Sequence, residues 1–385
     1  MAAPINRRSA LKAAVAAPAV LAAGSAQAVP TDGAAPPILV SLSDYEAAAH
    51  AKLSDPAWAY FGGGSADEIT LHRNRTALDA LRLMPHVLVD VEKVDMSTTL
   101  LGHQLAHPIL LAPTSSHVLA HPDAEVATVK GAGMAGAIMV ASTVSNRSIE
   151  EICAAATGPV WFQLYLLDDR VQAASLIRRA EAAGAKALVV TADNPFAYAR
   201  NREERQRGKM PQIPFGNLGI VAEPGGRISP RRRFKWDDLA WIKSISGLPI
   251  VLKGILNPDD AEEAVKRGVA AVVVSNHGGR ILDTLPATIE ALPGVVRRVG
   301  RRVPILFDGG VRRGTDILKA LGAGADAVLI GRPTVFGLAV AGPEGVRDVV
   351  ALLRKEFEGA MAMTGRRKLS EIDASVFWRR SELDA

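Results

Sequence analysis

Short apolar segments of this chain repeatedly end in polar residues of the kinds that bind ligands or move protons. Eight such groups occur between residues 113 and 332, each after a run of aliphatic residues. If the runs are parallel strands of one barrel, the groups meet at its carboxyl end and form one active site. The groups are Pro113-Thr114-Ser115, Ser142-Thr143, Gln163-Leu164-Tyr165, Thr191-Ala192-Asp193, Lys253-Gly254, Ser275-Asn276-His277-Gly278-Gly279-Arg280, Asp308-Gly309-Gly310 and Gly331-Arg332.

Taken singly, the charged members of these groups have ordinary structural explanations. His277 suits a turn, Asp193 a helix cap, and Lys253 a buried stem with its head in water. Their joint position at the ends of consecutive strands favours an electron-transfer site instead. Neither Lys253 nor Arg280 has a serine or cysteine arranged beside it for acyl transfer.

Two of the groups are rich in glycine and arginine, which indicates a phosphate site. Residues 308–314 read Asp-Gly-Gly-Val-Arg-Arg-Gly, and Gly331-Arg332-Pro333 follows a later aliphatic run. Glycine lets backbone N–H groups approach an anion, and helix N-termini add a favourable dipole. Tight turns with exposed arginines are the alternative, but the paired placement matches the place where α/β barrels commonly bind phosphate.

The elements that must position these residues are eight β-rich runs separated by amphipathic stretches. The runs are apolar on both faces, as parallel strands covered by helices must be. We therefore predict the α/β class, and a (β/α)₈ barrel rather than an open sheet. The expected strands are 108–114, 137–143, 160–166, 187–193, 249–255, 271–276, 304–308 and 327–331, with helices such as 169–183, 258–267 and 314–321 between them.

Two regions are expected outside the repeating units. Ahead of the barrel, 43–55 and 66–78 read as helices, with Tyr60-Phe61-Gly62-Gly63-Gly64 between them. After Asp193, 55 residues precede the next strand, and 200–233 is rich in Arg, Pro and Gly. A loop of that length in a compact domain is usually a lid or a binding insertion. We therefore expect an active-site loop after the fourth strand.

The first 28 residues have the composition of an export signal. Arg7, Arg8 and Lys12 precede an uncharged apolar run that ends in Ala26-Gln27-Ala28, which resembles an A-x-A cleavage site. The adjacent arginines resemble a twin-arginine signal, which exports proteins that are already folded. An amphipathic helix packed on the domain is the alternative. We expect 1–28 to be removed, the mature domain to span 29–385, and the protein to be periplasmic.

Charge and cysteine content restrict the partners. The net charge of +5 falls to +2 without residues 1–28, so no nucleic-acid partner is expected. The basic cluster 231–233, together with Lys235, suits a solvated loop, or a contact of the 200–233 loop with an anionic membrane. Cys153 is the only cysteine, so no intrachain disulfide can form.

Two motifs with a known chemistry stand in the wrong context. Residues 131–136 match G-x-G-x-x-G, but they close a predicted helix and precede a strand, the reverse of a dinucleotide site. The histidine pairs 103/107 and 117/121 have helical spacing, yet no HExxH glutamate accompanies them. We expect neither a dinucleotide site nor a metal site.

Several segments together resemble one protein family. They are Val251-Leu252-Lys253-Gly254, 275–280, 308–316 and Ile330-Gly331-Arg332-Pro333, in that order. Over residues 41–366 the chain is similar to the FMN-dependent 2-hydroxy-acid oxidases and dehydrogenases, which include glycolate oxidase, L-lactate dehydrogenases, lactate monooxygenases and mandelate dehydrogenase. The resemblance implies oxidation of a small (S)-2-hydroxy acid to the 2-oxo acid, with FMN as cofactor.

The resemblance also implies catalytic roles. His277 would be the base that takes a proton from the substrate while two electrons pass to flavin N5, and Asp193 would stabilise its imidazolium. Whether the α-carbon proton leaves first, or hydride moves while the base takes the hydroxyl proton, stays open. Fork-shaped guanidinium groups suit a substrate carboxylate. The other expected substrate contacts are Arg280, Arg200 and Tyr60 at the carboxylate, and Tyr165 at the hydroxyl or developing carbonyl oxygen.

FMN contacts follow from the same resemblance. Lys253 would lie by flavin N1 and O2 and favour the anionic reduced flavin. The backbone near Thr114 and Ser115 would lie against the ring. The remaining expected contacts are Ser142, Gln163 and Thr191 at the isoalloxazine edge, Asp308 at the ribityl chain, Gly310, Gly331, Arg312 and Arg332 at the phosphate, and also Ser275 and Gly309.

Departures from the family pattern leave the substrate and the electron acceptor open. Ser115 stands where Ala or Gly is common, near flavin N5, and Val144 replaces a bulky aromatic residue at the pocket mouth. O2, a cytochrome c or a quinone would each fit as acceptor, and family members are commonly tetramers.

Two functions from other classes are the alternatives. One is a non-redox barrel enzyme, either an FMN-dependent isomerase or a phosphosugar aldolase. The other is a protein that binds flavin without turnover. The joint presence of His277, Asp193 and Arg280 argues against both.

Overall fold

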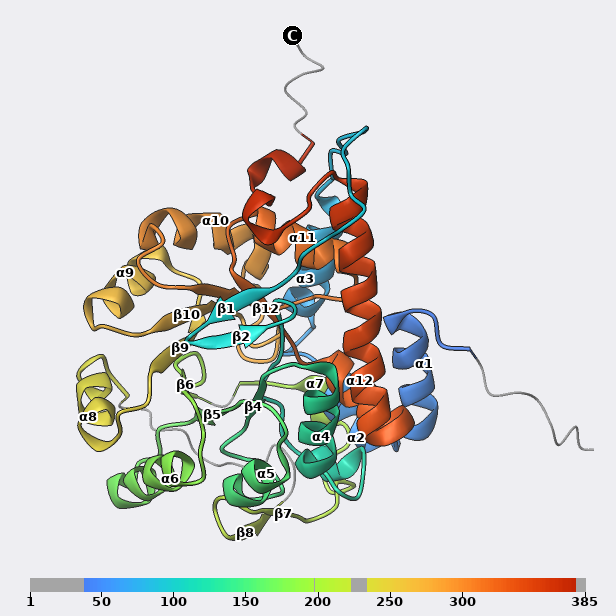
Figure 1. Ribbon diagram of the computed structural model, residues 1–385. Coiled ribbons are helices and arrows are strands. Elements are labelled where there is room, and N and C mark those ends of the chain that lie inside the picture. The colour runs from blue at the N-terminus through green and yellow to red at the C-terminus, as the bar shows by residue number, and fades with distance from the viewer. Residues whose placement is uncertain (1–37, 197, 223–233, 379–385) are drawn as a thin grey trace, which may run out of the picture. The chain divides into compact units, whose positions relative to one another are not determined.

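Eight parallel strands close into a barrel, as the sequence predicts (Figure 1). The computed structural model describes residues 38–378 except Ala197 and 223–233, so the predicted signal and the basic cluster 231–233 lie outside the described residues. The strand order around the barrel is β3-β4-β5-β6-β9-β10-β11-β12, and β12 pairs with β3 to close it.

Every barrel strand falls inside its predicted run but is shorter than the run. The polar residues that follow the strands leave the hydrogen-bonded ladder, and this frees them to form the mouth of the barrel. The strands are β3 (Ile109–Leu111), β4 (Met139–Ala141), β5 (Val160–Leu164), β6 (Leu188–Thr191), β9 (Ile250–Ile255), β10 (Ala271–Val274), β11 (Ile305–Phe307) and β12 (Ala327–Ile330).

Helices follow the strands and cover the outer face of the barrel (Figure 1). Several begin at residues whose side chains accept backbone N–H groups of the first turn, as at Ser148, Asp169 and Asn257. The last helix is interrupted at Ala341 and Gly342, where the backbone is not helical. The helices are α4 (Glu125–Ala135), α5 (Ile149–Ala155), α6 (Arg170–Ala182), α8 (Asp237–Ile245), α9 (Pro258–Lys266), α10 (Thr288–Val299), α11 (Gly314–Gly322) and α12 (Arg332–Met363).

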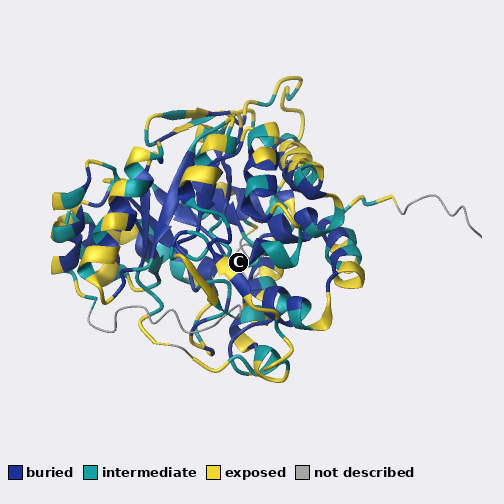
Figure 2. Cartoon of the chain, turned by 90° about the horizontal axis from the view of Figure 1, so that it is seen from below, coloured by how far each residue is buried: buried dark blue, intermediate teal, exposed yellow. Residues whose placement is uncertain are grey.

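The strands are buried on both faces, which explains their continuous aliphatic sequence (Figure 2). In β3, Leu110 belongs to the cluster inside the barrel, whereas Ile109 and Leu111 belong to the cluster between strands and helices. Leu100 and Leu105 join the inner cluster from the hairpin of β1 (Thr98–Leu100) and β2 (His103–Leu105). The sequence analysis did not predict this hairpin.

The helices ahead of the barrel differ from the prediction. The first, α1 (Leu42–Lys52), ends before residue 55, and α2 (Asp55–Gly62) begins after the cap Ser54 with Pro56 in its first turn. Tyr60 therefore lies in the last turn of α2 and not in a loop between helices. The third helix, α3 (Ile69–Ala80), matches its predicted position closely.

The long connection after β6 has secondary structure of its own. It contains α7 (Asn201–Glu204) and a hairpin of β7 (Ile213–Phe215) and β8 (Ile220–Ala222). The G-x-G-x-x-G segment, 131–136, ends α4 ahead of β4, as predicted. Within the described residues, no helix has the length and apolar character needed to span a bilayer.

Candidate active site

The predicted polar groups gather at the C-terminal ends of the barrel strands. His277 follows β10, Asp193 follows β6, and Lys253 lies in the second half of β9 between them. Asp193 passes close to β9 because residue 254 is glycine. A Cβ there would lie 2.6 Å from that of Asp193, and Gly254 has φ +105°.

His277 and Asp193 form a hydrogen-bonded pair. Nδ1 of His277 lies 2.9 Å from Oδ1 of Asp193, and the two side chains are 18% and 13% exposed. An ionised carboxylate only accepts hydrogen bonds, so Nδ1 carries the proton and Nε2 is left as the basic nitrogen. The hydroxyl of Tyr165 lies 3.3 Å from that Nε2.

Burial and neighbouring charges set the protonation of this pair. Burial lowers the pKa of His277 below its ordinary value, an effect that Asp193 opposes and Lys253 reinforces. Burial alone would raise the pKa of Asp193, but the positive neighbours His277 and Lys253 outweigh it and the pKa is lowered. At neutral pH the pair is therefore a neutral imidazole held by a carboxylate. Burial raises the pKa of Tyr165 to about 12, so its hydroxyl keeps its proton.

The turn that carries His277 is held from outside the barrel. His277 has φ +58°, a left-handed conformation that a residue with a Cβ adopts only when its surroundings impose it. The preceding Asn276 exchanges two side-chain hydrogen bonds, of 2.9 and 2.8 Å, with Asn74 of α3. Sequence reasoning missed Asn74, since only the folded chain brings α3 against the turn.

Lys253 belongs to a second buried network. Its ammonium donates to the hydroxyl of Ser275 at 2.8 Å and lies 3.2 Å from Oδ2 of Asp308, which also accepts from Ser275. Burial would lower the pKa of Lys253, but Asp308 and Asp193 outweigh it and the pKa is raised. Lys253 is therefore a cation on β9 that Ser275 and Asp308 hold in place.

Three polar side chains form a chain across β4, β5 and β6. The hydroxyl of Ser142 donates to Oε1 of Gln163 at 3.1 Å, and Nε2 of Gln163 donates to Thr191 at 3.0 Å. All three residues are buried. Together with Lys253 they line one arc of the barrel mouth with donors and acceptors, as an isoalloxazine edge requires.

The predicted phosphate loop follows β11. Gly309 and Gly310 have φ +105° and +81°, and a Cβ on Gly310 would lie 2.5 Å from the carbonyl oxygen of Asn74. Only glycine fits such a close, left-handed turn. Arg312 lies nearby with its Nε 3.6 Å from Glu46, and burial lowers the pKa of its guanidinium.

The second part of the predicted phosphate site differs from expectation. Gly331 caps the N-terminus of α12, but Arg332 donates to the carbonyls of Phe61, Gly278 and Gly63 at 2.9, 3.0 and 2.7 Å. Burial lowers the pKa of Arg332 to about 9. The guanidinium thus ties the end of α2 to the turn of His277, and its contact with phosphate stays a prediction.

The segment after β3 contacts the substrate side of the site. The hydroxyl of Tyr60 lies 2.5 Å from that of Ser115 and accepts from Ser116 at 3.3 Å. Thr114 is instead held by the buried His117, with 2.5 Å between its hydroxyl and Nε2. The sequence analysis predicted Ser115 for its backbone, whereas the structure shows that its side chain positions Tyr60.

Arg280 and Arg200 converge as predicted, and a third charged residue joins them. Nε of Arg200 donates to the carbonyl of Arg280 at 3.2 Å. Nη2 of Arg280 lies 2.8 Å from Oε1 of Glu203, and Nη1 of Arg200 lies 3.4 Å from Oε2. We call Arg200, Arg280 and Glu203 the arginine cluster. Sequence reasoning missed Glu203, although its place three residues after Arg200, within one helical turn, was a usable signal.

The residues present fit FMN. Oδ1 of Asp308 and Oδ2 of Asp193 are buried and have no hydrogen-bond partner among the described residues. Buried acceptors of this kind need a partner, and hydroxyl groups of a ligand at the mouth would supply it. A polar arc for a ring, an orphaned acceptor for a hydroxylated chain and a glycine turn for a phosphate match the three parts of FMN.

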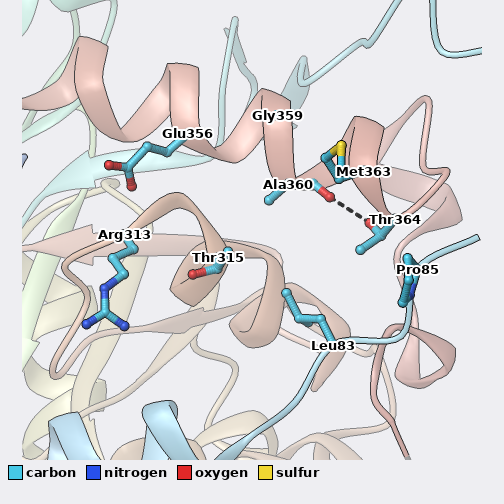
Figure 3. Close-up of a pocket in the computed structure, with 9 residues that line it drawn as sticks. All are labelled: Leu83, Pro85, Arg313, Thr315, Glu356, Gly359, Ala360, Met363 and Thr364. Carbon is cyan, nitrogen blue, oxygen red and sulfur yellow. Dashed lines mark hydrogen bonds between the residues drawn. The ribbon is translucent and has the colours of Figure 1, made fainter.

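The apolar hollow drawn in Figure 3 lies elsewhere. It has a volume of about 580 Å³, lies beside α11 and the end of α12, and includes Leu83, Arg313 and Met363 in its lining. None of the predicted site residues lines it. The hollow is therefore separate from the candidate active site.

Comparisons with known proteins identify the family. The family model for FMN-dependent dehydrogenases matches residues 49–379. A peroxisomal (S)-2-hydroxy-acid oxidase of Oryza sativa subsp. japonica is 45% identical over 349 residues, which cover 87% of this chain and 95% of the relative. An L-lactate oxidase of Nostoc sp. is 44% identical over 356 residues, with 87% and 97% covered.

Solved structures give the same result. A mandelate oxidase with (S)-4-hydroxymandelic acid superposes with a TM-score of 0.82 at 36% identity, covering 88% of this chain and 98% of that one. The matched residues contain every barrel strand and every predicted site residue. The chain therefore belongs to the FMN-dependent dehydrogenase family and is an FMN-dependent oxidoreductase.

Proposed function

We propose that this enzyme oxidises a small (S)-2-hydroxy acid to the 2-oxo acid and passes the electrons to O2. The observation that carries the proposal is the His277–Asp193 pair beside the arginine cluster. An imidazole whose Nε2 carries no proton and a cationic site for a carboxylate lie at the same mouth of the barrel. The relatives described above oxidise lactate or other 2-hydroxy acids, which supports both the substrate class and the acceptor.

The chain's own residues perform the acid–base part of this reaction. The substrate loses two electrons and two protons, and FMN, when bound, would take up the two electrons together with one of the protons. Nε2 of His277 accepts one proton, and Asp193 stabilises the imidazolium that results. Tyr165, protonated at neutral pH, donates to the substrate oxygen, while Arg280 and Arg200 orient the carboxylate.

Cofactor binding falls to the residues of the mouth. Ser142, Gln163 and Thr191 would hold the ring edge, and Lys253 would stabilise negative charge on the ring. Asp308 would accept from the ribityl chain. The phosphate would lie on the backbone of Gly309, Gly310 and Gly331, with Arg312 and Arg332 nearby.

Anaerobic reduction tests the proposal. Purified enzyme with its FMN is mixed under nitrogen with glycolate, lactate or mandelate. The absorbance of the oxidised flavin near 450 nm is then followed. Bleaching by one of these acids would exclude an isomerase and a non-catalytic flavin binder. Reoxidation of the reduced enzyme by O2, cytochrome c and a quinone in a stopped-flow instrument then identifies the acceptor. Failure of all three acids to bleach the flavin would refute the proposed reaction.

We also propose that residues 1–28 direct export through the twin-arginine route. A cofactor made in the cytoplasm gives a reason to fold before export, and a chain with one cysteine does not need disulfides to fold. Changing Arg7 and Arg8 to Lys should leave flavin-loaded enzyme in the cytoplasm. A double variant still found in the periplasm with FMN would exclude this route.

We further propose a tetrameric assembly and a contact with anionic membranes. The tetramer follows only from the family resemblance and is tested by light scattering of the purified enzyme. Membrane contact rests on the basic 200–233 loop, part of which lies outside the described residues. Sedimentation with anionic and neutral vesicles tests it, and equal binding to both would exclude an electrostatic contact.

A further inference from the structure

The carboxylate of Glu203 lies on the two arginines that are expected to bind the substrate carboxylate. Its oxygens contact Arg280 at 2.8 Å and Arg200 at 3.4 Å. The side chains of Glu203 and Arg280 are 14% and 16% exposed, so little water screens this pair. The pair has the geometry that a guanidinium adopts with a carboxylate ligand.

Glu203 is held in this place by the chain on either side. Arg202 forms an ion pair with Glu68, which in turn accepts from the backbone N–H of Gly64 at 2.9 Å. Just before α7, the carbonyl of Ala199 accepts from the backbone N–H of Ala66 at 2.8 Å. The α7 turn is therefore attached to the segment after α2, and the position of Glu203 is built into the fold.

Glu203 also uses part of the binding capacity of Arg280. Nη1 of Arg280 donates to the carbonyls of Tyr60 and Gly63 at 2.5 and 2.9 Å, and Nη2 donates to Glu203. A guanidinium has five N–H groups, so these three contacts leave two for a ligand. These two N–H groups of Arg280 match the two oxygens of one substrate carboxylate.

The net charge of the arginine cluster also matches a single substrate carboxylate. Two arginines and one glutamate carry a net charge of +1. Elsewhere in the mouth, Lys253 is paired with Asp308, and Asp193 beside the neutral His277 adds a further negative charge. One substrate carboxylate neutralises the cluster, and a second carboxylate close to the first would meet the fixed negative charge of Glu203.

We propose that Glu203 is a specificity-determining residue that restricts the arginine cluster to a single substrate carboxylate. The enzyme accordingly prefers 2-hydroxy monocarboxylates such as lactate and discriminates against 2-hydroxy dicarboxylates such as malate. Discrimination arises from a repulsive element built against the wrong substrate, in addition to attraction for the right one. This inference rests on the proposed oxidation of 2-hydroxy acids.

The decisive measurement is the ratio of kcat/KM for malate to kcat/KM for lactate. In Glu203→Gln the cluster carries +2, so this ratio should rise at least about tenfold over the wild type, whatever happens to the absolute rates. Glu203→Asp keeps the charge and should keep the ratio. Glu204→Gln is the matched control, because Glu204 is the next residue of α7, is 59% exposed and pairs only with Arg207 among the described residues.

A charge-balanced double variant separates charge from structure. Arg200→Gln/Glu203→Gln returns the cluster to +1, so its malate-to-lactate ratio should lie within about threefold of the wild type. The double variant also avoids a buried unpaired arginine if the single variant does not fold. Calorimetric titration with the unreactive acids propionate and succinate measures the same selectivity without turnover.

The outcomes distinguish the inference from the proposed function. A ratio that rises in Glu203→Gln and returns in the double variant supports it. Equal losses for both substrates in Glu203→Gln, or an increased ratio in the double variant, would overturn it. A wild-type enzyme that binds FMN but oxidises none of glycolate, lactate, mandelate and malate would instead overturn the proposed reaction and leave the binding titrations as the test of Glu203.

Discussion

The His277–Asp193 pair and the arginine cluster lie in one mouth but are built in different ways. Asp193 and His277 lie two and three residues after the ends of β6 and β10, two buried strands of the closed barrel. The cluster draws Arg200 and Glu203 from the inserted segment after β6, and only Arg280 from a turn next to a strand. The proposed proton transfer would thus be supported by the barrel, and the proposed carboxylate binding largely by an insertion.

This difference indicates which part of the site can be substituted without disturbing the barrel. The barrel strands hold the pair at 2.9 Å and give its atoms little freedom, which suits a step that needs one geometry. The insertion is attached by polar contacts such as that of Arg202 with Glu68, so its residues can be exchanged without altering the barrel. We expect substitutions in the pair to affect kcat most, and those in the cluster to affect substrate selection.

Replacing His277 should have the largest effect on turnover. His277→Gln should lower kcat roughly 10³–10⁴-fold while FMN stays bound, because a positioned base contributes up to that factor and glutamine cannot take the proton. Steady-state kinetics and flavin absorbance of the same sample measure both effects. His72→Gln, at an exposed position on α3, is the control. More than a tenth of wild-type turnover in His277→Gln would exclude His277 as the base.

Asp193→Asn should have the next largest effect and should alter the pH dependence. We expect a loss of roughly 10²-fold in kcat, because an amide can hold the imidazole in the wrong tautomer. Neutral His277 is the active form, so activity falls as pH falls through its pKa. Asp193 raises that pKa against the effect of burial. Its removal should therefore move the acid limb of kcat/KM to lower pH, and a limb that stays in place or moves to higher pH would contradict this assignment.

Arg280→Lys tests the arginine cluster. Losing a bidentate contact to a carboxylate costs about 1.5–3 kcal/mol, or roughly ten- to a hundred-fold in kcat/KM. The acid limb of the pH profile should stay unchanged, unlike that of Asp193→Asn. Arg347→Lys, at an exposed position on α12, is the control. Unchanged kcat/KM for lactate and glycolate would show that another residue binds the carboxylate.

Tyr60→Phe should have the smallest effect. The hydroxyl contacts Ser115 and Ser116, and its loss removes neutral hydrogen bonds worth about 0.5–1.5 kcal/mol, so kcat/KM should fall roughly two- to tenfold. Ser115→Ala should lower it less, since Ser116 still donates to Tyr60. A loss above a hundredfold in Tyr60→Phe would place Tyr60 with the proton-transfer residues and remove the distinction between the two regions.

The parts of the site that the sequence predicted are those attached to strand ends. A strand buried on both faces must be aliphatic, and polar residues become possible where the chain leaves the ladder, so His277 and Asp193 stand out by position. Lys253 stands out as the one charged residue within the aliphatic strand β9. Tyr60 was predicted as a site residue but assigned to a loop, because the cap at Ser54 that begins α2 was overlooked. Asn74 and Ser116 were not predicted, since their partners lie 202 and 56 residues away along the chain.

The sequence by itself determined the barrel and, through its resemblance, the family. The barrel follows from local patterns, in which aliphatic runs, glycine turns and polar ends recur at regular spacing. The expected roles of His277, Asp193 and Lys253 follow from the resemblance and stay predictions. Only the tertiary structure decided that Glu203 joins Arg280, that Ser115 positions Tyr60, and that Arg332 ties α2 to the catalytic turn. These contacts join segments whose separation no local pattern encodes. The first depends on how the insertion after β6 folds back to the mouth, and the other two on how α2 packs against the segment after β3 and the start of α12.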